Sequence, residues 1–344
     1  MKNTIILSAI LIATMFQINA QQKVLLHSQG KVSQFSGANP LIAAYDSAQF
    51  GDTMYLSGGV FATPTLFNKK LYLFGAGFHL DSTQATNPSQ ISGQLNLGES
   101  SDYSIFEGIQ FANNVQAAHN ISASYLTFKR CKFNSYITFN GDITTNPAIN
   151  NAFLECVVMG EAHLTNLTSS TFQNCFLQSI IVNTRSNLFR NNILAHNQPN
   201  SYTGGVLHSP FFNEFSNNIF LNAGYRFVYA SNDGNIFNNN IFVYSSIDFG
   251  ANAIVNNNYI GVNHADIFVN QSGYTYSFNH NYNLKNPSTY MGNDNTQVGI
   301  YGGIFPYKPG AVPSNPHISK SVISGTTDNS GDLEIEIEVN AQDK

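Results

Sequence analysis

The sequence predicts an all-β chain that winds into a parallel β-helix, a solenoid in which each coil stacks on the one before it. Three observations predict this fold. A six-residue motif recurs along the chain, its copies are spaced by about 21 to 22 residues on average, and its fourth position is cysteine in early copies and asparagine in later ones. A repeat of roughly 20 to 50 residues is typical of solenoid proteins.

The copies of the motif have the alternation expected of β-strands. Apolar and polar residues alternate inside each copy in short runs, which Asn, Gly and Ser bound. Successive copies begin 22, 25, 19, 17, 26, 22, 18 and 23 residues apart, which fits strands of constant length joined by loops of variable length. The copies begin at Phe106, Phe128, Phe153, Phe172, Phe189, Phe215, Phe237, Val255 and Phe278, the first degenerate and the last two weak.

The fourth motif position predicts an internal ladder of side chains. An inward Asn amide can bond both the bend between two strands and the Asn of the coils above and below it. Cysteine is small and weakly polar, so it fits the same tight interior. After Ile109 in the degenerate copy, the predicted ladder consists of Cys131, Cys156, Cys175, Asn192, Asn218, Asn240, Asn258 and Asn281.

The three cysteines are an odd number, so at least one thiol stays free within a single chain. Stacking in neighbouring coils brings Cys156 within disulfide distance of Cys131 or Cys175. Side chains in a β ladder point in parallel, however, and a disulfide needs a specific dihedral angle. We therefore expect buried free thiols, with a Cys131–Cys156 or a Cys156–Cys175 bond as the alternative.

With this motif column, the chain resembles the right-handed parallel β-helix proteins of the pectin-lyase-like superfamily, and more narrowly the secreted β-helix repeat proteins of Bacteroidota-type bacteria. Residues 39–59 resemble the family's N-terminal capping helix and first coil, and 70–79 and 298–306 resemble further segments of that group. The resemblance implies a right-handed coil over most of residues 23–310. It implies no single activity, because the superfamily contains lyases, hydrolases and adhesins.

The chain divides into three predicted regions. Residues 1–20 have the basic start, apolar run and small-residue end of a signal peptide. The β-helix with its N-terminal cap is expected over 21–285, and a C-terminal loop and β-strand capping segment over 286–344. In that last segment, 333–339 alternates strictly and is expected to form a hairpin with Val322 and Ile323. We therefore expect a secreted, periplasmic or cell-surface protein without a membrane span.

Composition excludes one class of partner. Only 10% of residues are charged and the net charge is -5, so the chain lacks the basic stripe of a nucleic-acid binder. No metal site is predicted and no cofactor is expected. Calcium would enter only if the chain were a polysaccharide lyase.

The strongest candidate for chemistry is a polar centre of Arg226, Asp248 and Asp266. Each residue lies seven positions after the fifth residue of a motif copy, so strand alternation places all three outward in one column. Two carboxyl groups about 5 Å apart suit the acid and nucleophile of a retaining glycosidase, or a cation site for an acidic polysaccharide. The alternative is a solvated charge column whose ion pair contributes about 0 to 1 kcal/mol.

These observations predict an exported, non-catalytic β-helix protein that binds a glycan or another surface component along its coils. The alternative is a polysaccharide lyase or glycoside hydrolase that acts on an extended polysaccharide. The long steps from 128 to 153 and from 189 to 215 supply loops for either activity. Tyrosines of the late coils are candidates for stacking on sugar rings, with interior packing as the alternative: Tyr225, Tyr229, Tyr244, Tyr259, Tyr274 and Tyr276.

Overall fold

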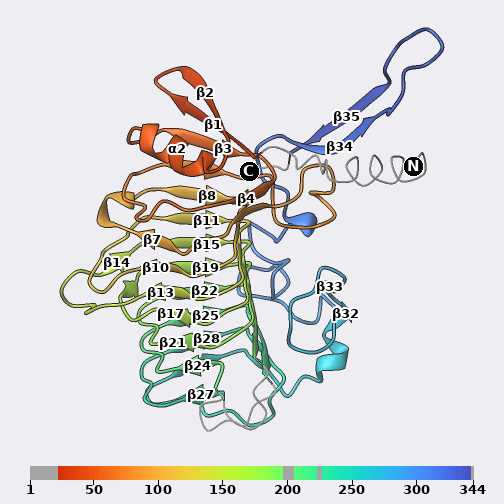
Figure 1. The fold of residues 1–344 in the computed structure, drawn as a ribbon. Coiled ribbons are helices and arrows are strands. Elements are labelled where there is room, and N and C mark those ends of the chain that lie inside the picture. Colours follow the sequence, from red (N-terminus) through yellow and green to blue (C-terminus); the bar gives the residue numbers. More distant parts are fainter. Residues whose placement is uncertain (1–21, 197–204, 223–226, 342–344) are drawn as a thin grey trace, which may run out of the picture.

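The computed structural model describes residues 22–196, 205–222 and 227–341, and it shows an all-β parallel β-helix (Figure 1). Three sheets, here called A, B and C, run along the stack, and the chain passes through them in that order in each complete coil. The fold predicted from the repeat is therefore confirmed. The expected signal peptide, residues 1–20, lies outside the described residues.

Sheet A contains the first two residues of each motif copy from Phe106 to Val255, together with the residue before them. β1 pairs antiparallel with β2 and β3, and the later neighbours pair in parallel. The motif phenylalanines are in register, so Phe128 lies between Phe106 and Phe153. In spatial order the sheet consists of β2 (Lys31–Ser36), β1 (Lys23–Ser28), β3 (Thr53–Leu56), β5 (Tyr72–Phe74), β8 (Ile105–Glu107), β11 (Thr127–Lys129), β15 (Ala152–Leu154), β19 (Thr171–Gln173), β22 (Leu188–Arg190), β25 (Glu214–Ser216), β28 (Ile236–Asn238) and β30 (Ile254–Asn256).

Sheets B and C complete the coils, and all their neighbouring strands pair in parallel. Sheet B consists of β4 (Gly59–Phe61), β6 (Ser89–Ile91), β9 (Gln110–Phe111), β12 (Lys132–Phe133), β16 (Val157–Val158), β20 (Phe176–Leu177), β23 (Ile193–His196), β26 (Ile219–Asn222), β29 (Ile241–Phe242) and β31 (Tyr259–Ile260). Sheet C consists of β7 (Leu95–Leu97), β10 (Val115–Ala117), β13 (Ile137–Phe139), β17 (Ala162–His163), β21 (Ile181–Val182), β24 (Leu207–His208) and β27 (Val228–Tyr229).

The remaining elements lie outside these three sheets. Helix α2 (Pro40–Ser47) begins at a proline within the segment that resembles a capping helix, and it lies at the N-terminal end of the stack (Figure 1). Short 3-10 helices are η1 (Glu99–Ser101), η2 (His264–Asp266) and η3 (Pro309–Ala311), and the two-stranded sheets are β14 (Ala148–Ile149) with β18 (Leu167–Thr168), β32 (Phe268–Asn270) with β33 (Asn281–Leu284), and β34 (His317–Ile323) with β35 (Ile335–Asn340). The antiparallel pairing of Ile323 with Ile335 confirms the predicted C-terminal hairpin.

The sharp bend between sheets A and B explains two motif positions. The third-position residue has a left-handed backbone in each coil from Gly108 to Asn257, with φ between 50° and 69°. Glycine and asparagine adopt this conformation at the lowest cost, which accounts for the Asn at this position in the later copies. The next residue then points inward and carries the ladder.

Hydrogen bonds join the ladder from coil to coil. Asn218 donates its side-chain amide to the Phe189 carbonyl at 2.9 Å and to Asn240 Oδ1 at 3.0 Å, and its own Oδ1 accepts from the Asn192 backbone at 2.9 Å. The cysteine thiols reach equivalent carbonyls, as when Cys175 donates to Phe153 at 3.2 Å. Beside the ladder, the motif phenylalanines stack with centroid separations of 4.4 to 5.1 Å.

A second polar ladder lies two residues before the motif phenylalanines of the middle coils, from Asn151 to Asn235, at the opposite edge of sheet A. The backbone N–H of Ser170 donates to Asn187 Oδ1 at 2.9 Å, and the N–H groups of Asn187 and Asn213 each donate to the asparagine of the following coil. Its members lie before the six-residue motif and include Ser170 among the asparagines, so the motif alone does not reveal it.

The stack of strands ends earlier than predicted, and Asn281 is not part of the ladder. The last strands of sheets A and B are β30 and β31, whereas Asn281 is an exposed residue of β33, which pairs only with β32. The reason is a second apolar core. Sheet B presents large apolar side chains outward, and Tyr282 and Leu284 of β33 pack into the cluster that covers them.

The chain between β33 and β34 returns along the stack toward its N-terminal end (Figure 1). Residues 291–314, here called the strap, follow the corner between sheets A and B. Third-position asparagines hold it, because Asn239 donates to the Met291 carbonyl and Asn174 donates to the carbonyls of Ile300 and Gly302. No helix in the described part of the chain is long and apolar enough to cross a membrane.

Candidate functional site

The predicted polar centre is not seen as a unit. Arg226 lies outside the described residues. Asp248 is exposed in the connection between β29 and β30, where it accepts a hydrogen bond from the Gly250 backbone at 2.9 Å. Asp266 is exposed at the end of η2, which follows the last coil. The prediction assumed that residue 266 lies on a coil strand, whereas the chain has left the stack by then.

The late tyrosines serve mainly the second core. Tyr276 is buried and its hydroxyl lies 3.1 Å from that of Tyr307, and burial raises the pKa of Tyr276 to about 12. Tyr259 donates its hydroxyl to the Met291 carbonyl at 3.2 Å. Tyr225 lies outside the described residues. The interior alternative therefore holds for Tyr276, whereas Tyr229, Tyr244 and Tyr274 are only partly buried.

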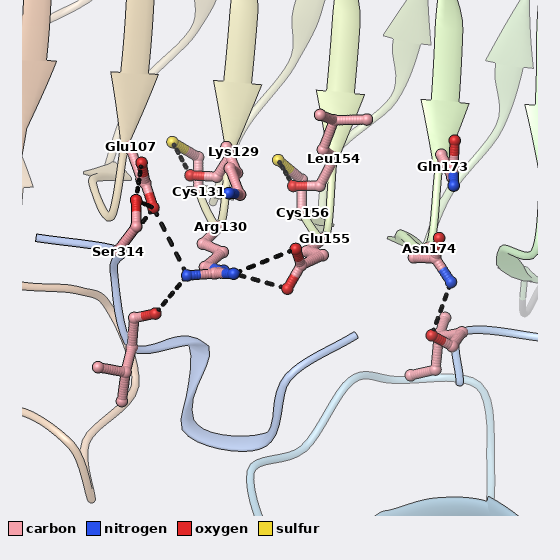
Figure 2. A network of polar contacts seen from close by, with 12 residues as sticks. Glu107, Lys129, Arg130, Cys131, Leu154, Glu155, Cys156, Gln173, Asn174 and Ser314 are labelled. Atoms are coloured by element: carbon pink, nitrogen blue, oxygen red, sulfur yellow. Dashed lines mark hydrogen bonds and ion pairs between the residues drawn. The ribbon is translucent and has the colours of Figure 1, made fainter. Parts of the chain in front are cut away.

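A buried ionic network occupies the third motif position of two early coils (Figure 2). Arg130 is fully buried, and its guanidinium contacts Glu155 at 3.1 Å and Glu107 at 3.6 Å. Its Nη1 also donates to the Val312 carbonyl of the strap at 2.9 Å. Glu107 accepts hydrogen bonds from both the backbone N–H and the hydroxyl of Ser314 at 2.7 Å.

This network is closed to ligands, because Arg130, Glu107 and Glu155 expose almost no surface. Its chemistry is structural. Arg130 and Glu155 have the left-handed backbone conformation that asparagine adopts at the same position in later coils. Their larger side chains add the ion pairs that asparagine cannot make. Since Ser314 and Val312 belong to the strap, the network fixes the strap at the corner beside β8 and β11 and thereby positions residues 315–318.

Those residues form one wall of an open cleft over the first strands of sheet A. The floor is a single row of side chains on the outer face, in which Gln34, Leu25, Tyr55 and Phe74 are register partners across β2, β1, β3 and β5. The rings of Tyr55 and Phe74 stack with centroids 5.7 Å apart and planes 23° apart. Tyr55 is 39% exposed, so the row offers an accessible apolar surface.

We call this site the aromatic cleft. Its volume is about 490 Å³. Its lining residues are Lys23, Leu25, Gln34, Tyr55, Leu56, Ser57, Gly58, Phe74, Gly75, Ala76, Ala85, Thr86, Asn315, Pro316, His317 and Ile318. A cleft of this size, mostly apolar with a few polar groups, is the usual form of a small-molecule or sugar site.

The unpartnered polar atoms of the aromatic cleft are one donor and one acceptor. The donor is Asn315 Nδ2, and the acceptor is His317 Nδ1, because His317 Nε2 donates to the Ser82 carbonyl at 3.2 Å. Asn315 Nδ2 and His317 Nδ1 are buried atoms without a hydrogen-bond partner in the described part of the chain. Lys23 adds an ammonium group, and none of the described lining residues is an aspartate or a glutamate. The cleft therefore suits a neutral or anionic ligand that combines an apolar face with both donors and acceptors of hydrogen bonds, as a sugar ring with its hydroxyls does.

Sequence reasoning missed the aromatic cleft for an identifiable reason. The alternation in 53–56 and 72–74 indicates that Tyr55 and Phe74 point outward. The sequence therefore contains a recognisable pattern for these two of the four floor residues. No sequence pattern indicates the wall formed by residues 315–318, because Asn315 reaches sheet A only after the strap has returned along the stack.

The described residues contain no group of three or more His, Cys, Asp or Glu side chains placed to hold a metal ion. Comparison of the chain with protein-family models, with curated proteins and with solved structures gives no match in any of the three. The likeness to the pectin-lyase-like superfamily therefore rests on the motif and on the parallel β-helix itself.

Proposed function

We propose that this protein is an exported, non-catalytic β-helix that binds a glycan in the aromatic cleft. The observation that carries the proposal is the exposed Tyr55–Phe74 pair, set in a row of side chains beside the unpartnered polar atoms of Asn315 and His317. Aromatic rings offer a large apolar contact at a low cost in conformational entropy. The N-terminal segment 1–20 supports export, and the pectin-lyase-like motif column supports a polysaccharide as the partner.

Binding is favoured over hydrolysis by the composition of the cleft. A glycoside hydrolase of the usual kind needs two carboxyl groups that flank the scissile bond. The described residues that line the aromatic cleft supply neither of them. Asp248 and Asp266, the predicted pair, lie on segments near the other end of the stack.

A variant of Tyr55 tests the proposal. Residues 21–344 are run through native gels that contain one neutral or acidic polysaccharide each, and retardation measures the affinity. We expect retardation on at least one polysaccharide and a roughly two- to tenfold weaker affinity for Tyr55→Ala, because stacking on an aromatic ring contributes about 0.5 to 1.5 kcal/mol. Reducing ends and absorbance from unsaturated products are followed in parallel.

The matched control is Tyr136→Ala, which removes an exposed tyrosine that lies immediately before β13 of sheet C, outside the cleft. Equal weakening by both variants would show that the cleft is not the site. Turnover of a polysaccharide would replace the binding protein with the lyase or hydrolase alternative. Equal thermal unfolding midpoints establish that both variants are folded.

A further inference from the structure

A second cleft lies where the chain passes from sheet C back to sheet A, beside β13 to β24. Its volume is about 430 Å³. One wall is Gly141–Ile143, which belongs to the long step between the motif copies at 128 and 153. The lining residues are Gly141, Asp142, Ile143, Thr165, Asn183, Arg185, Ser209 and Phe211, and we call the site the Arg185 cleft.

Arg185 is held by rings rather than by an acid. Its guanidinium carbon lies 4.7 Å from the centre of the Phe211 ring and 5.4 Å from that of Phe212. Within the described residues Arg185 makes no ion pair, whereas Arg130 and Arg190 pair with glutamates. A guanidinium remains charged at every relevant pH, and stacking on a ring leaves its N–H edge available for an oxyanion.

The acidic residue of the cleft is already engaged. The carboxylate of Asp142 accepts hydrogen bonds from the Thr144 backbone and hydroxyl at 2.9 and 2.7 Å, and from the Thr145 hydroxyl at 3.2 Å. These bonds lower the pKa of Asp142, so its carboxylate stays ionised. They also hold the carboxylate against Thr144 and Thr145 of its own loop. Asp142 is therefore a negative charge near the site, but it is not the partner of Arg185.

Neutral polar groups surround the rest of the cleft. Asn183 donates its amide to the Thr165 hydroxyl at 3.2 Å, and Ser209 adds another hydroxyl from the next coil. Hydroxyl and amide groups of this kind recognise the hydroxyls of a sugar, while a guanidinium recognises an oxyanion through two parallel hydrogen bonds. The lining of this cleft therefore contains both a guanidinium and neutral hydroxyl and amide groups.

We propose that the Arg185 cleft binds an acidic saccharide, with its carboxylate or sulfate-ester oxyanion on the guanidinium of Arg185 and its hydroxyls on Thr165, Asn183 and Ser209. The site is built from different residues than the aromatic cleft and does not depend on it. Loss of binding in a Tyr55 variant therefore tests the aromatic cleft, and loss of binding in an Arg185 variant tests the Arg185 cleft.

The test is titration calorimetry on residues 21–344 with four probes. These are a uronate trisaccharide, the same trisaccharide with its carboxylates methyl-esterified, a sulfated neutral trisaccharide and inorganic phosphate. We expect the esterified probe to bind at least about tenfold more weakly than the uronate, and Arg185→Gln to lose about tenfold for the acidic probes only. Comparison of the uronate with the sulfated probe distinguishes the two oxyanion sources.

Two further variants sharpen the result. Arg190→Gln removes an exposed arginine that already pairs with Glu214, so it should leave the affinity for every probe unchanged. Asp142→Asn removes the nearby negative charge and should strengthen binding of the acidic probes. Equal affinity for the uronate and its ester, unchanged affinity in Arg185→Gln, or binding of phosphate alone would each overturn the proposal, as would no binding of any probe at millimolar concentration.

Discussion

At the scale of the residue, one hydrogen-bond acceptor explains why cysteine and asparagine interchange at the fourth motif position. Cys156 donates its thiol to the Phe128 carbonyl at 3.3 Å, and Asn192 donates its amide to the Phe172 carbonyl at 2.9 Å. Both side chains also accept from the preceding coil, as Cys175 Sγ does from the Cys156 N–H at 3.4 Å and Asn192 Oδ1 does from the Cys175 N–H at 2.9 Å. The amide does more than the thiol, because its second N–H donates to the asparagine of the next coil, as Asn192 does to Asn218 Oδ1 at 3.0 Å. The three cysteines are free and buried, as expected, and burial raises the pKa of the Cys156 thiol.

This difference predicts how the ladder responds to substitution. Asn218→Ala leaves the buried Asn192 N–H without its partner and removes a bond to the Phe189 carbonyl, so we expect it to lower the free energy of unfolding by about 1 to 3 kcal/mol. Asn218→Cys keeps one donor and should cost less. Asn281→Ala, at the position outside the ladder, should change stability by less than about 0.5 kcal/mol in the same urea titration.

A cost at residue 281 equal to that at residue 218 would contradict the assignment of the ladder. Seven of the eight predicted members lie in the ladder, because each stands two residues after a sheet A strand of constant length. The prediction fails at Asn281 because the same letters, Asn-Tyr, also suit a hairpin strand whose tyrosine packs on sheet B. A motif records which residues alternate, and it does not record what they pack against.

At the scale of the element, the strap is what the sequence does not reveal. The strands of the coils can be recognised in the sequence by their period. Residues 291–314 have no period, and their hydrogen-bond partners are side chains of coils far away in the sequence. Ser314 donates to Glu107 across 207 residues of sequence. Proline and glycine in this region correctly indicate a loop, but its path follows from the third-position side chains, which carry no pattern of their own in the early coils.

The network at Arg130 makes the strap testable. Arg130→Met leaves Glu107 and Glu155 buried without their cation, and removing one partner of a buried pair costs about 3 to 5 kcal/mol. We expect a lower urea midpoint and faster proteolysis within 291–314. The triple variant that adds Glu107→Gln and Glu155→Gln has no unpaired buried charge, so it should recover much of the loss. A triple variant less stable than Arg130→Met would contradict this account.

At the scale of the whole molecule, the C-terminal part of the chain closes onto the first coils. The hydroxyl of Ser82 donates to the Gly310 carbonyl at 2.7 Å, and the ring of His79 contacts that of Phe278 with centroids 4.5 Å apart. The aromatic cleft lies at this closure, between sheet A and residues 315–318. The β-helix was therefore predictable from the sequence, and the cleft was not, since it exists only where the two parts of the chain meet.

This closure predicts a loss of stability in weak acid. Burial lowers the pKa of His79, in spite of the Asp81 charge, and burial likewise lowers the pKa of His196. Because both values lie below the unfolded value of about 6.5, the unfolded chain binds more protons as the pH falls through that value. The free energy of unfolding should therefore be constant above about pH 7.5 and decrease as the pH falls from about 7 toward the folded pKa values.

The histidines responsible are identified by a double variant. His79→Asn keeps an acceptor for the Asp81 N–H, and His196→Gln keeps an amide in place of the ring, while neither side chain titrates. Urea midpoints measured between pH 8 and pH 5 should fall less steeply for the double variant than for the native chain. Equal slopes would assign the acid sensitivity to other groups, of which His280, whose pKa burial also lowers, is the next to replace. A shallower slope for His79→Asn alone would place a share of the acid sensitivity at the junction between the first coils and the C-terminal segment, where the aromatic cleft is formed.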